Sequence, residues 1–322
     1  MMLELNNNNY TDKDMKFIGK EQQIINILPI RFRQDFMKMN IIFDQLQEIR
    51  IRIGQTIYLY CNENELGIYG KKNRVIPEDI QEMLAYISQY SLYAYEYEVK
   101  QGFITIQGGH RVGLVGQAII EENRIKNLKN ISSLNIRVAH QVRGCSHSVV
   151  PYLIERGRLL NTLFIAPPKC GKTTMLRDVI RYISNHLHMT VGVVDERSEL
   201  AACYHGVPQN DLGCRTDILD ACPKVDGLLM LVRSMSPQVV VVDEIGGRDE
   251  IETLEYAMCC GCVVIASVHG MDWKDIQRKP VWNQLIKQKL FERYVVLSQL
   301  VHGKNIKGVY DANGTSLYEA HG

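Results

Sequence analysis

Residues 166–173 have the types and spacing that can hold a phosphate group. They read Ala-Pro-Pro-Lys-Cys-Gly-Lys-Thr and lie between an apolar run, 162–165, and an apolar-periodic segment that begins at Met175. A strand, a loop and a helix in that order turn backbone N–H groups and a helix N-terminus toward phosphate oxygens. Lys172 is then the cation for the β- and γ-phosphates, and Thr173 offers its hydroxyl to Mg²⁺. The stretch therefore predicts a nucleotide-binding site.

The phosphate-binding stretch departs from the commonest pattern at two positions. Ala166 and Lys169 stand where Gly is frequent, and a Cβ at either position penalises a positive φ. The spacing to Gly171 is intact, so we expect nucleotide binding, and the departures bear on the catalytic rate more than on binding. The residues predicted to bind the nucleotide are Ala166, Pro167, Pro168, Lys169, Cys170, Gly171, Lys172, Thr173 and Thr174.

An acidic pair follows a run of valines further along the chain. Residues 239–242 predict a buried strand, and Asp243 and Glu244 come directly after it. Parallel sheets bind ligands at the carboxyl ends of their strands, so we expect this pair beside the phosphate loop. There Asp243 can hold Mg²⁺, and Glu244 can polarise a water for in-line attack on the γ-phosphate. A helix N-cap is the simpler interpretation, but the phosphate loop upstream argues against it.

Two other strand ends carry side chains that can do chemistry. Asp195 and Glu196 follow an apolar run, and their carboxylates can orient water or metal, whereas Glu199 can instead pair with Arg197. Ser267 and His269 lie at the end of another strand at the same sheet edge, where a Ser or a His can sense the γ-phosphate through a hydrogen bond. The alternative for His269 is a loop histidine without a catalytic role.

Composition restricts the class of protein. The chain has 322 residues, of which 46% are apolar and 23% charged, as in ordinary globular proteins. The net charge of +1 gives no bulk electrostatic case for nucleic acid or an anionic membrane. Nine cysteines without a disulfide-framework spacing, and a polar N-terminus without a signal-peptide core, favour a reducing cytoplasm. No apolar stretch reaches the ~18 residues of a spanning helix, so we expect a soluble or at most peripheral protein.

The elements that must position these side chains fall into two regions. A polar tail over residues 1–20 is expected to be disordered. Residues 21–143 predict an N-terminal α+β domain, which includes a strand at 48–53 where Ile alternates with charged residues. Residues 144–322 alternate short apolar strands with helices, which is typical of a mainly parallel sheet with helices on both faces. The expected fold class is therefore α/β, with a P-loop core and a smaller N-terminal domain.

Several local expectations within the C-terminal region are testable against a structure. We expect a helix over 148–156, an irregular polar loop over 206–217, and edge strands at 294–300 and 308–310. The cysteines within 259–262 are interpreted as small apolar residues packed at a helix-to-strand junction rather than as metal ligands.

Together these features resemble the sporulation stage III AA family, a relative of the hexameric secretion ATPases of type II and type IV systems. The resemblance covers roughly residues 45–300, and its most specific part is residues 206–220. The matching stretches are residues 109–113, 133–137, 166–174, 195–199, 206–220, 233–246 and 267–270.

The resemblance implies a RecA-like ATPase core that uses ATP and Mg²⁺ and forms a homo-oligomer, a hexamer in the related enzymes. It implies a mother-cell cytoplasmic protein that powers or gates a channel complex in the membranes around the forespore. Membrane-anchored proteins of that assembly would be its partners and would place it at the membrane periphery. It also implies that arginines of the N-terminal domain act on the γ-phosphate. Arg111 and Arg137 lie in matching stretches, and the alternative is that both are strand-surface charges.

Other functions share parts of this pattern. A nucleic-acid-dependent ATPase is the second interpretation, because related folds drive helicases, but the near-neutral charge argues against it. A nucleotide-gated scaffold without hydrolysis is disfavoured by the pair Asp243 and Glu244. A small-molecule kinase has the same phosphate loop, but the sequence shows no acceptor site.

Overall fold

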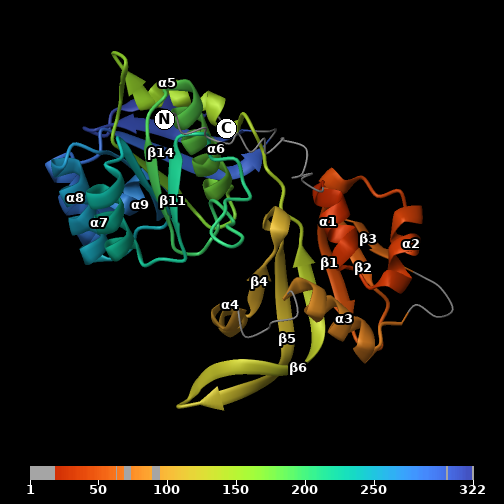
Figure 1. The fold of residues 1–322 in the computed structure, drawn as a ribbon. Helices are drawn as coiled ribbons and strands as arrows, with labels where there is room; N and C mark the ends of the chain where they lie inside the picture. Colours follow the sequence, from red (N-terminus) through yellow and green to blue (C-terminus); the bar gives the residue numbers. More distant parts are fainter. Residues whose placement is uncertain (1–18, 63, 69–73, 89–94, 302–303, 321–322) are drawn as a thin grey trace, which may run out of the picture. The chain divides into compact units, whose positions relative to one another are not determined.

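The computed structural model in Figure 1 forms two units, Met1–Ala139 and His140–Gly322. The sequence places the boundary a few residues later, between 143 and 144. The predicted tail lies outside the described residues up to residue 18, and the first helix begins at Lys20. The residues that the structure describes are 19–62, 64–68, 74–88, 95–301 and 304–320.

The N-terminal unit is built on a six-stranded sheet in the order β3-β2-β1-β6-β5-β4, and all its neighbouring strands are antiparallel. Its strands are β1 Leu46–Arg52, β2 Tyr58–Cys61, β3 Asn64–Gly67, β4 Phe103–Thr105, β5 Arg111–Glu121 and β6 Arg124–Arg137. Its helices are α1 Lys20–Ile27, α2 Ile30–Lys38, α3 Pro77–Ile87 and α4 Glu96–Gln101. Beyond the other strands, β5 and β6 continue together as a two-stranded hairpin (Figure 1).

Alternation along its strands gives this sheet one apolar and one polar face. On β1, Ile49 and Ile51 are fully buried, whereas Glu48 and Arg50 are partly exposed. The buried side chains join those of α1, α2 and α3 in one hydrophobic cluster. The strand predicted over 48–53 is therefore present, with the single buried face that its pattern indicates.

The C-terminal unit contains an eight-stranded sheet in the order β11-β10-β12-β13-β9-β14-β15-β16. Neighbours from β11 through β14 are parallel, and β15 and β16 are added antiparallel. The strands are β9 Thr162–Ala166, β10 Val191–Asp195, β11 Thr216–Asp220, β12 Val239–Val242, β13 Val263–His269, β14 Arg293–Val301, β15 Lys304–Asp311 and β16 Ser316–Glu319. The helices are α5 Val150–Leu153, α6 Lys172–His186, α7 Lys224–Met235, α8 Arg248–Cys259, α9 Trp273–Arg278 and α10 Pro280–Gln288.

Helices cover both faces of this sheet. On β12, Val239 and Val241 pack in the cluster that contains α6, whereas Val240 and Val242 pack in the cluster that contains α7 and α8. All four side chains are fully buried, as expected for a strand whose sequence is a continuous apolar run. Figure 1 shows α7 and α8 packed together on their side of the sheet. None of the described helices is long and apolar enough to cross a bilayer.

The helix predicted over 148–156 is wrong beyond Leu153. The chain turns there into a short hairpin of β7 Ile154–Glu155 and β8 Arg158–Leu159. Arg156 and Gly157 form its turn with φ of 50° and 78°. Positive φ at both turn positions matches the twist of a two-residue hairpin, and it cannot continue a right-handed helix.

The edge strands are also placed differently from the prediction. Residues 294–300 lie in β14, which is inside the sheet between β9 and β15. Its residues Tyr294 and Val295 are accordingly fully buried. Residues 308–310 lie in β15, whose outer side is covered by β16. At the opposite edge, β11 begins at Thr216, so the end of the expected polar loop is a strand.

The cysteines after α8 are only partly buried. Cys262 is buried, and its thiol lies 3.2 Å from the carbonyl oxygen of Pro237 at the start of β13. Cys259, the last residue of α8, and Cys260, which follows it, are exposed. The packed interpretation therefore holds for Cys262 and is wrong for the other two.

Candidate nucleotide site

The phosphate loop joins β9 to α6 at the carboxyl end of the sheet. Ala166 ends β9 and is buried, and Lys172 is the first residue of α6. Gly171 precedes the helix with a φ of 75°, a conformation that suits Gly. Lys169 also has a positive φ, 64°, which costs an ordinary residue roughly 1–2 kcal/mol. Of the two departures from the common pattern, only Lys169 therefore strains the backbone.

A residue from the far end of the chain braces this loop. Asn305 on β15 donates its side-chain amide to the carbonyl oxygen of Cys170 at 3.3 Å. Cys170 is buried, and its thiol lies 3.7 Å from the carbonyl oxygen of Pro168. Asn305 lies 135 residues from its partner, and no sequence pattern near it pointed to this contact.

Lys172 brings the phosphate loop and the acidic pair together. Its ammonium lies 2.8 Å from Oδ1 of Asp243 and 3.2 Å from Oε1 of Glu244. Thr173 donates its hydroxyl to Oδ2 of Asp243 at 3.0 Å. The Lys172 side chain is only 6% exposed, so its charge needs these carboxylates. Phosphate oxygens would compete with the carboxylates for the same ammonium.

Ser267 is the hydrogen-bonding centre of the site. Its hydroxyl donates to Asp243 and accepts from the backbone N–H of Glu244 at 2.9 Å and from Lys172 at 3.1 Å. The side chain is fully buried at the end of β13. The sequence placed Ser267 at this sheet edge but did not show that it contacts all three residues.

Replacing Ser267 with Ala should lower the free energy of unfolding by about 1–3 kcal/mol, because it leaves buried polar groups without a partner. Chemical denaturation of the two proteins measures the difference. Ser234→Ala is the matched control, since that hydroxyl lies on the exposed surface of α7 and donates to the carbonyl oxygen of Met230 in its own helix. Equal destabilisation by both substitutions would contradict a central role for Ser267.

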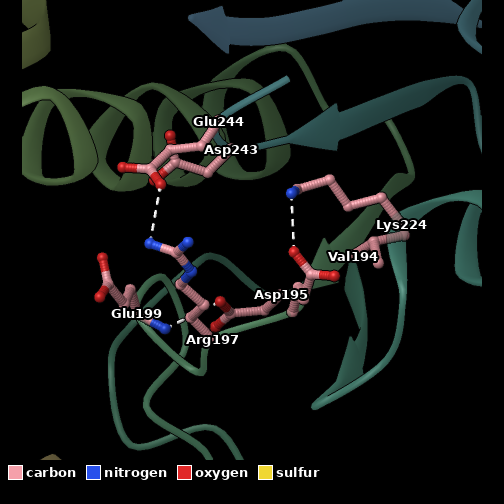
Figure 2. Close-up of a pocket in the computed structure, with 8 residues that line it drawn as sticks. Val194, Asp195, Arg197, Glu199, Lys224, Asp243 and Glu244 are labelled. Atoms are coloured by element: carbon pink, nitrogen blue, oxygen red, sulfur yellow. Dashed lines mark hydrogen bonds and ion pairs between the residues drawn. The ribbon is translucent and has the colours of Figure 1, made fainter. Parts of the chain in front are cut away.

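Glu244 is held by its backbone and by three basic side chains. Its φ of 59° is in the left-handed region, a strain that surrounding contacts must maintain. Its carboxylate lies 3.2 Å from Lys172, 3.1 Å from Nη1 of Arg197 and 3.0 Å from Nε2 of His269. Figure 2 shows the Arg197 side chain extending from its loop toward Glu244. Glu244 and His269 are thus brought together, as their positions at strand ends predicted.

Asp195 and Glu196 are engaged in separate contacts. Asp195 is 2% exposed and accepts backbone N–H groups of Glu199 and Ala201, each at 2.8 Å. Burial raises the pKa of Asp195 to about 6. Both of its oxygens therefore fix the loop after β10, and the hydrogen bonds that the structure gives them do not reach Lys172.

Glu196 belongs to an ionic group at the N-terminal ends of α7 and α8. It lies 2.7 Å from the ammonium of Lys224, which lies 3.3 Å from Glu250. Glu250 in turn accepts the N–H groups of Gly246 and Gly247 in the loop after β12. Although burial opposes the charge on Lys224, its pKa is raised because both carboxylates favour the ammonium. Sequence reasoning missed Lys224 and Glu250.

The two candidate arginines belong to the N-terminal unit. Arg111 on β5 and Arg137 on β6 are directly opposite each other in the sheet. Arg137 lies 3.7 Å from Glu48 and is 69% exposed, and the Arg111 guanidinium lies 4.8 Å from the ring centre of Phe103. Both are partnered on the polar face of their own sheet.

The fold is similar to those of two solved proteins, an ATPase and a pilus retraction motor. The structure is similar to the ATPase DotB of Legionella pneumophila, with a TM-score of 0.57 and 12% identity over 88% of this chain and 81% of that chain. It is also similar to the pilus retraction motor PilT with bound ADP, with a TM-score of 0.56 and 14% identity over 85% and 81% of the two chains. The predicted α/β fold with a P-loop core is confirmed.

Sequence comparison then identifies the family. A family model described as "Sporulation stage III, protein AA" matches residues 18–317. The stage III sporulation protein AA of Bacillus subtilis (strain 168) is 41% identical over 282 residues, which cover 86% of this chain and 91% of that protein. The chain belongs to the sporulation stage III protein AA family.

Proposed function

We propose that the chain is a Mg²⁺-dependent ATPase that works as a homo-oligomer and energises a sporulation channel complex. The observation that carries the proposal is the convergence of Lys172, Thr173, Asp243 and Glu244 at one sheet edge. A phosphate-binding cation, a metal ligand and a general base are the parts that hydrolysis by a P-loop enzyme requires.

The donor set fits Mg²⁺. Thr173 and Asp243 offer a hydroxyl and a carboxylate within 3.0 Å of each other, and both are oxygen ligands. Among the described residues, no group of three or more His, Cys, Asp or Glu side chains could hold a metal by itself. This suits an ion that takes most of its ligands from phosphate and water. When bound, Mg²⁺ neutralises charge on the β- and γ-phosphates.

Residues of the chain itself bind the phosphates and accept the proton of the attacking water. Lys172 exchanges its carboxylate partners for phosphate oxygens when ATP binds. Glu244 then keeps His269 as a partner and can accept the proton of the attacking water. Ser267 holds the Glu244 backbone through its N–H, so the base stays fixed during this exchange.

The assembly and its location rest on the family and on similarity to secretion ATPases. We propose a hexamer in the mother-cell cytoplasm, held at the membrane by membrane-anchored proteins of the channel complex. Arg111 or Arg137 of one subunit would act on the γ-phosphate bound by its neighbour, since the related enzymes draw arginines from this domain.

Purified protein should hydrolyse ATP in the presence of Mg²⁺, and chelation of the metal should abolish turnover. Phosphate release measures turnover, and native mass measurement with and without nucleotide gives the oligomeric state. A parallel arm with single-stranded DNA tests the alternative function. Strong stimulation by DNA would favour a nucleic-acid-dependent ATPase, and absence of turnover in every arm would contradict the proposed hydrolysis.

A further inference from the structure

The loop after β10 carries Arg197, and contacts with other residues hold the backbone of this loop in place. Asp195 holds the loop by accepting the N–H groups of Glu199 and Ala201. Arg177 on α6 donates to the carbonyl oxygens of Glu199 and Leu200, both at 2.9 Å. Because α6 begins at the phosphate loop, the backbone around Arg197 is tied to the helix that would bind the nucleotide.

The side chain on this loop reaches the same carboxylate as the phosphate-binding lysine. Arg197 contacts Oε2 of Glu244 at 3.1 Å, and Lys172 contacts Oε1 at 3.2 Å. One carboxylate group therefore bridges the two cations. An anion that binds Lys172 in place of Glu244 comes within reach of Arg197 as well.

Exposure and pairing distinguish Arg197 from the other cations near this pocket. Its side chain is 67% exposed, so leaving Glu244 requires little desolvation or disruption of packing. Lys224 also lines the pocket, but it is 10% exposed and pairs with Glu196 and Glu250. Of the two cations that line the pocket among the described residues, Arg197 is thus the more exposed.

We propose that Arg197 is a catalytic arginine supplied in cis, which leaves Glu244 and binds the γ-phosphate of ATP. The proposal rests on the ATPase function proposed above. As the water oxygen bonds to the γ-phosphorus, its proton passes to Glu244, and the bond to the β–γ bridging oxygen breaks with its electrons remaining on ADP. Arg197 stabilises the negative charge on the equatorial oxygens during this transfer.

The test compares Arg197→Ala with wild type by two measurements. Affinities for fluorescent ADP and for a fluorescent non-hydrolysable ATP analogue report the contact with the γ-phosphate without turnover. The variant should lose roughly tenfold to a hundredfold of its preference for the analogue, while its ADP affinity stays unchanged. Phosphate release should fall on the order of 10³-fold. Arg197→Lys should recover part of both effects, because it restores the charge without the planar fork.

Arg248→Ala is the matched control, since that arginine is 75% exposed on α8 and pairs only weakly with Glu252. It should match wild type in both measurements. If Arg197 only positions Glu244, turnover falls and the preference for the analogue is unchanged, which overturns the proposal. Unchanged turnover also overturns it. If wild type binds ATP but does not hydrolyse it, the proposed ATPase function is contradicted instead. The control variant would then show the same lack of turnover.

Discussion

Glu244→Gln should still bind ATP and should lose roughly 10²–10⁴-fold of its turnover, the contribution expected of a general base. The substitution keeps the size and shape of the side chain but removes the group that accepts a proton from water. It also removes one of the two carboxylates that compete with phosphate for Lys172. We therefore expect ATP affinity equal to or higher than that of wild type. Equilibrium binding and phosphate release measure the two quantities separately.

The control for this prediction is Glu252→Gln on α8. Glu252 is 66% exposed and forms a surface pair with Arg248, so its substitution should leave ATP affinity and turnover unchanged. Near-normal turnover in Glu244→Gln would show that another group accepts the proton. Glu196 would then be the next carboxylate to test, because Asp195 uses both oxygens to hold its loop.

The sequence sufficed to find the centre of this site because the decisive features are local. The loop ahead of Lys172 is defined by spacing within a few residues, and an apolar run before Asp243 predicts a buried strand. Parallel strands place their carboxyl ends at one edge of the sheet, so two distant stretches could be assigned to one site. The observed ion pair between Lys172 and Asp243 follows from that rule.

The remaining contacts depend on long-range packing that no local pattern contains. Ser267 meets Lys172 across 95 residues, and Arg197 meets Glu244 across 47. The sequence offered Arg197 as a partner for Glu199, and the structure places it against Glu244, whose φ is in the left-handed region. Asp195 was expected to orient water or metal, but burial and the N–H groups of its own loop give its carboxylate a different set of partners.

The errors in the fold have a similar origin. Two-residue strands such as β7 and β8 carry too few side chains for a pattern of alternation. The position of β14 inside the sheet depends on β9 pairing with it in parallel across the whole unit. A short apolar run predicts that a strand exists, but it does not say which strands lie beside it.

Mixing two inactive variants, Arg111→Ala and Lys172→Ala, should restore part of the ATPase activity if Arg111 acts across a subunit boundary. Arg111→Ala alone should lose on the order of 10³-fold of turnover, because an arginine on the equatorial oxygens stabilises the transition state. Lys172→Ala removes the cation that faces the phosphates. In a mixed oligomer, one subunit supplies the intact phosphate loop and its neighbour supplies Arg111, so some composite sites are complete.

The same design separates the two arginines that are proposed to act on the γ-phosphate. Arg197 belongs to the same subunit as its phosphate loop, so mixing Arg197→Ala with Lys172→Ala should restore nothing. Native mass spectra must show subunit exchange in both mixtures, because only then does missing activity have a meaning. Exchange without recovery in the first mixture contradicts action in trans. If Arg111→Ala alone is fully active, Arg111 is not part of the site. Arg137, which is opposite it on the neighbouring strand, is then the residue to substitute next.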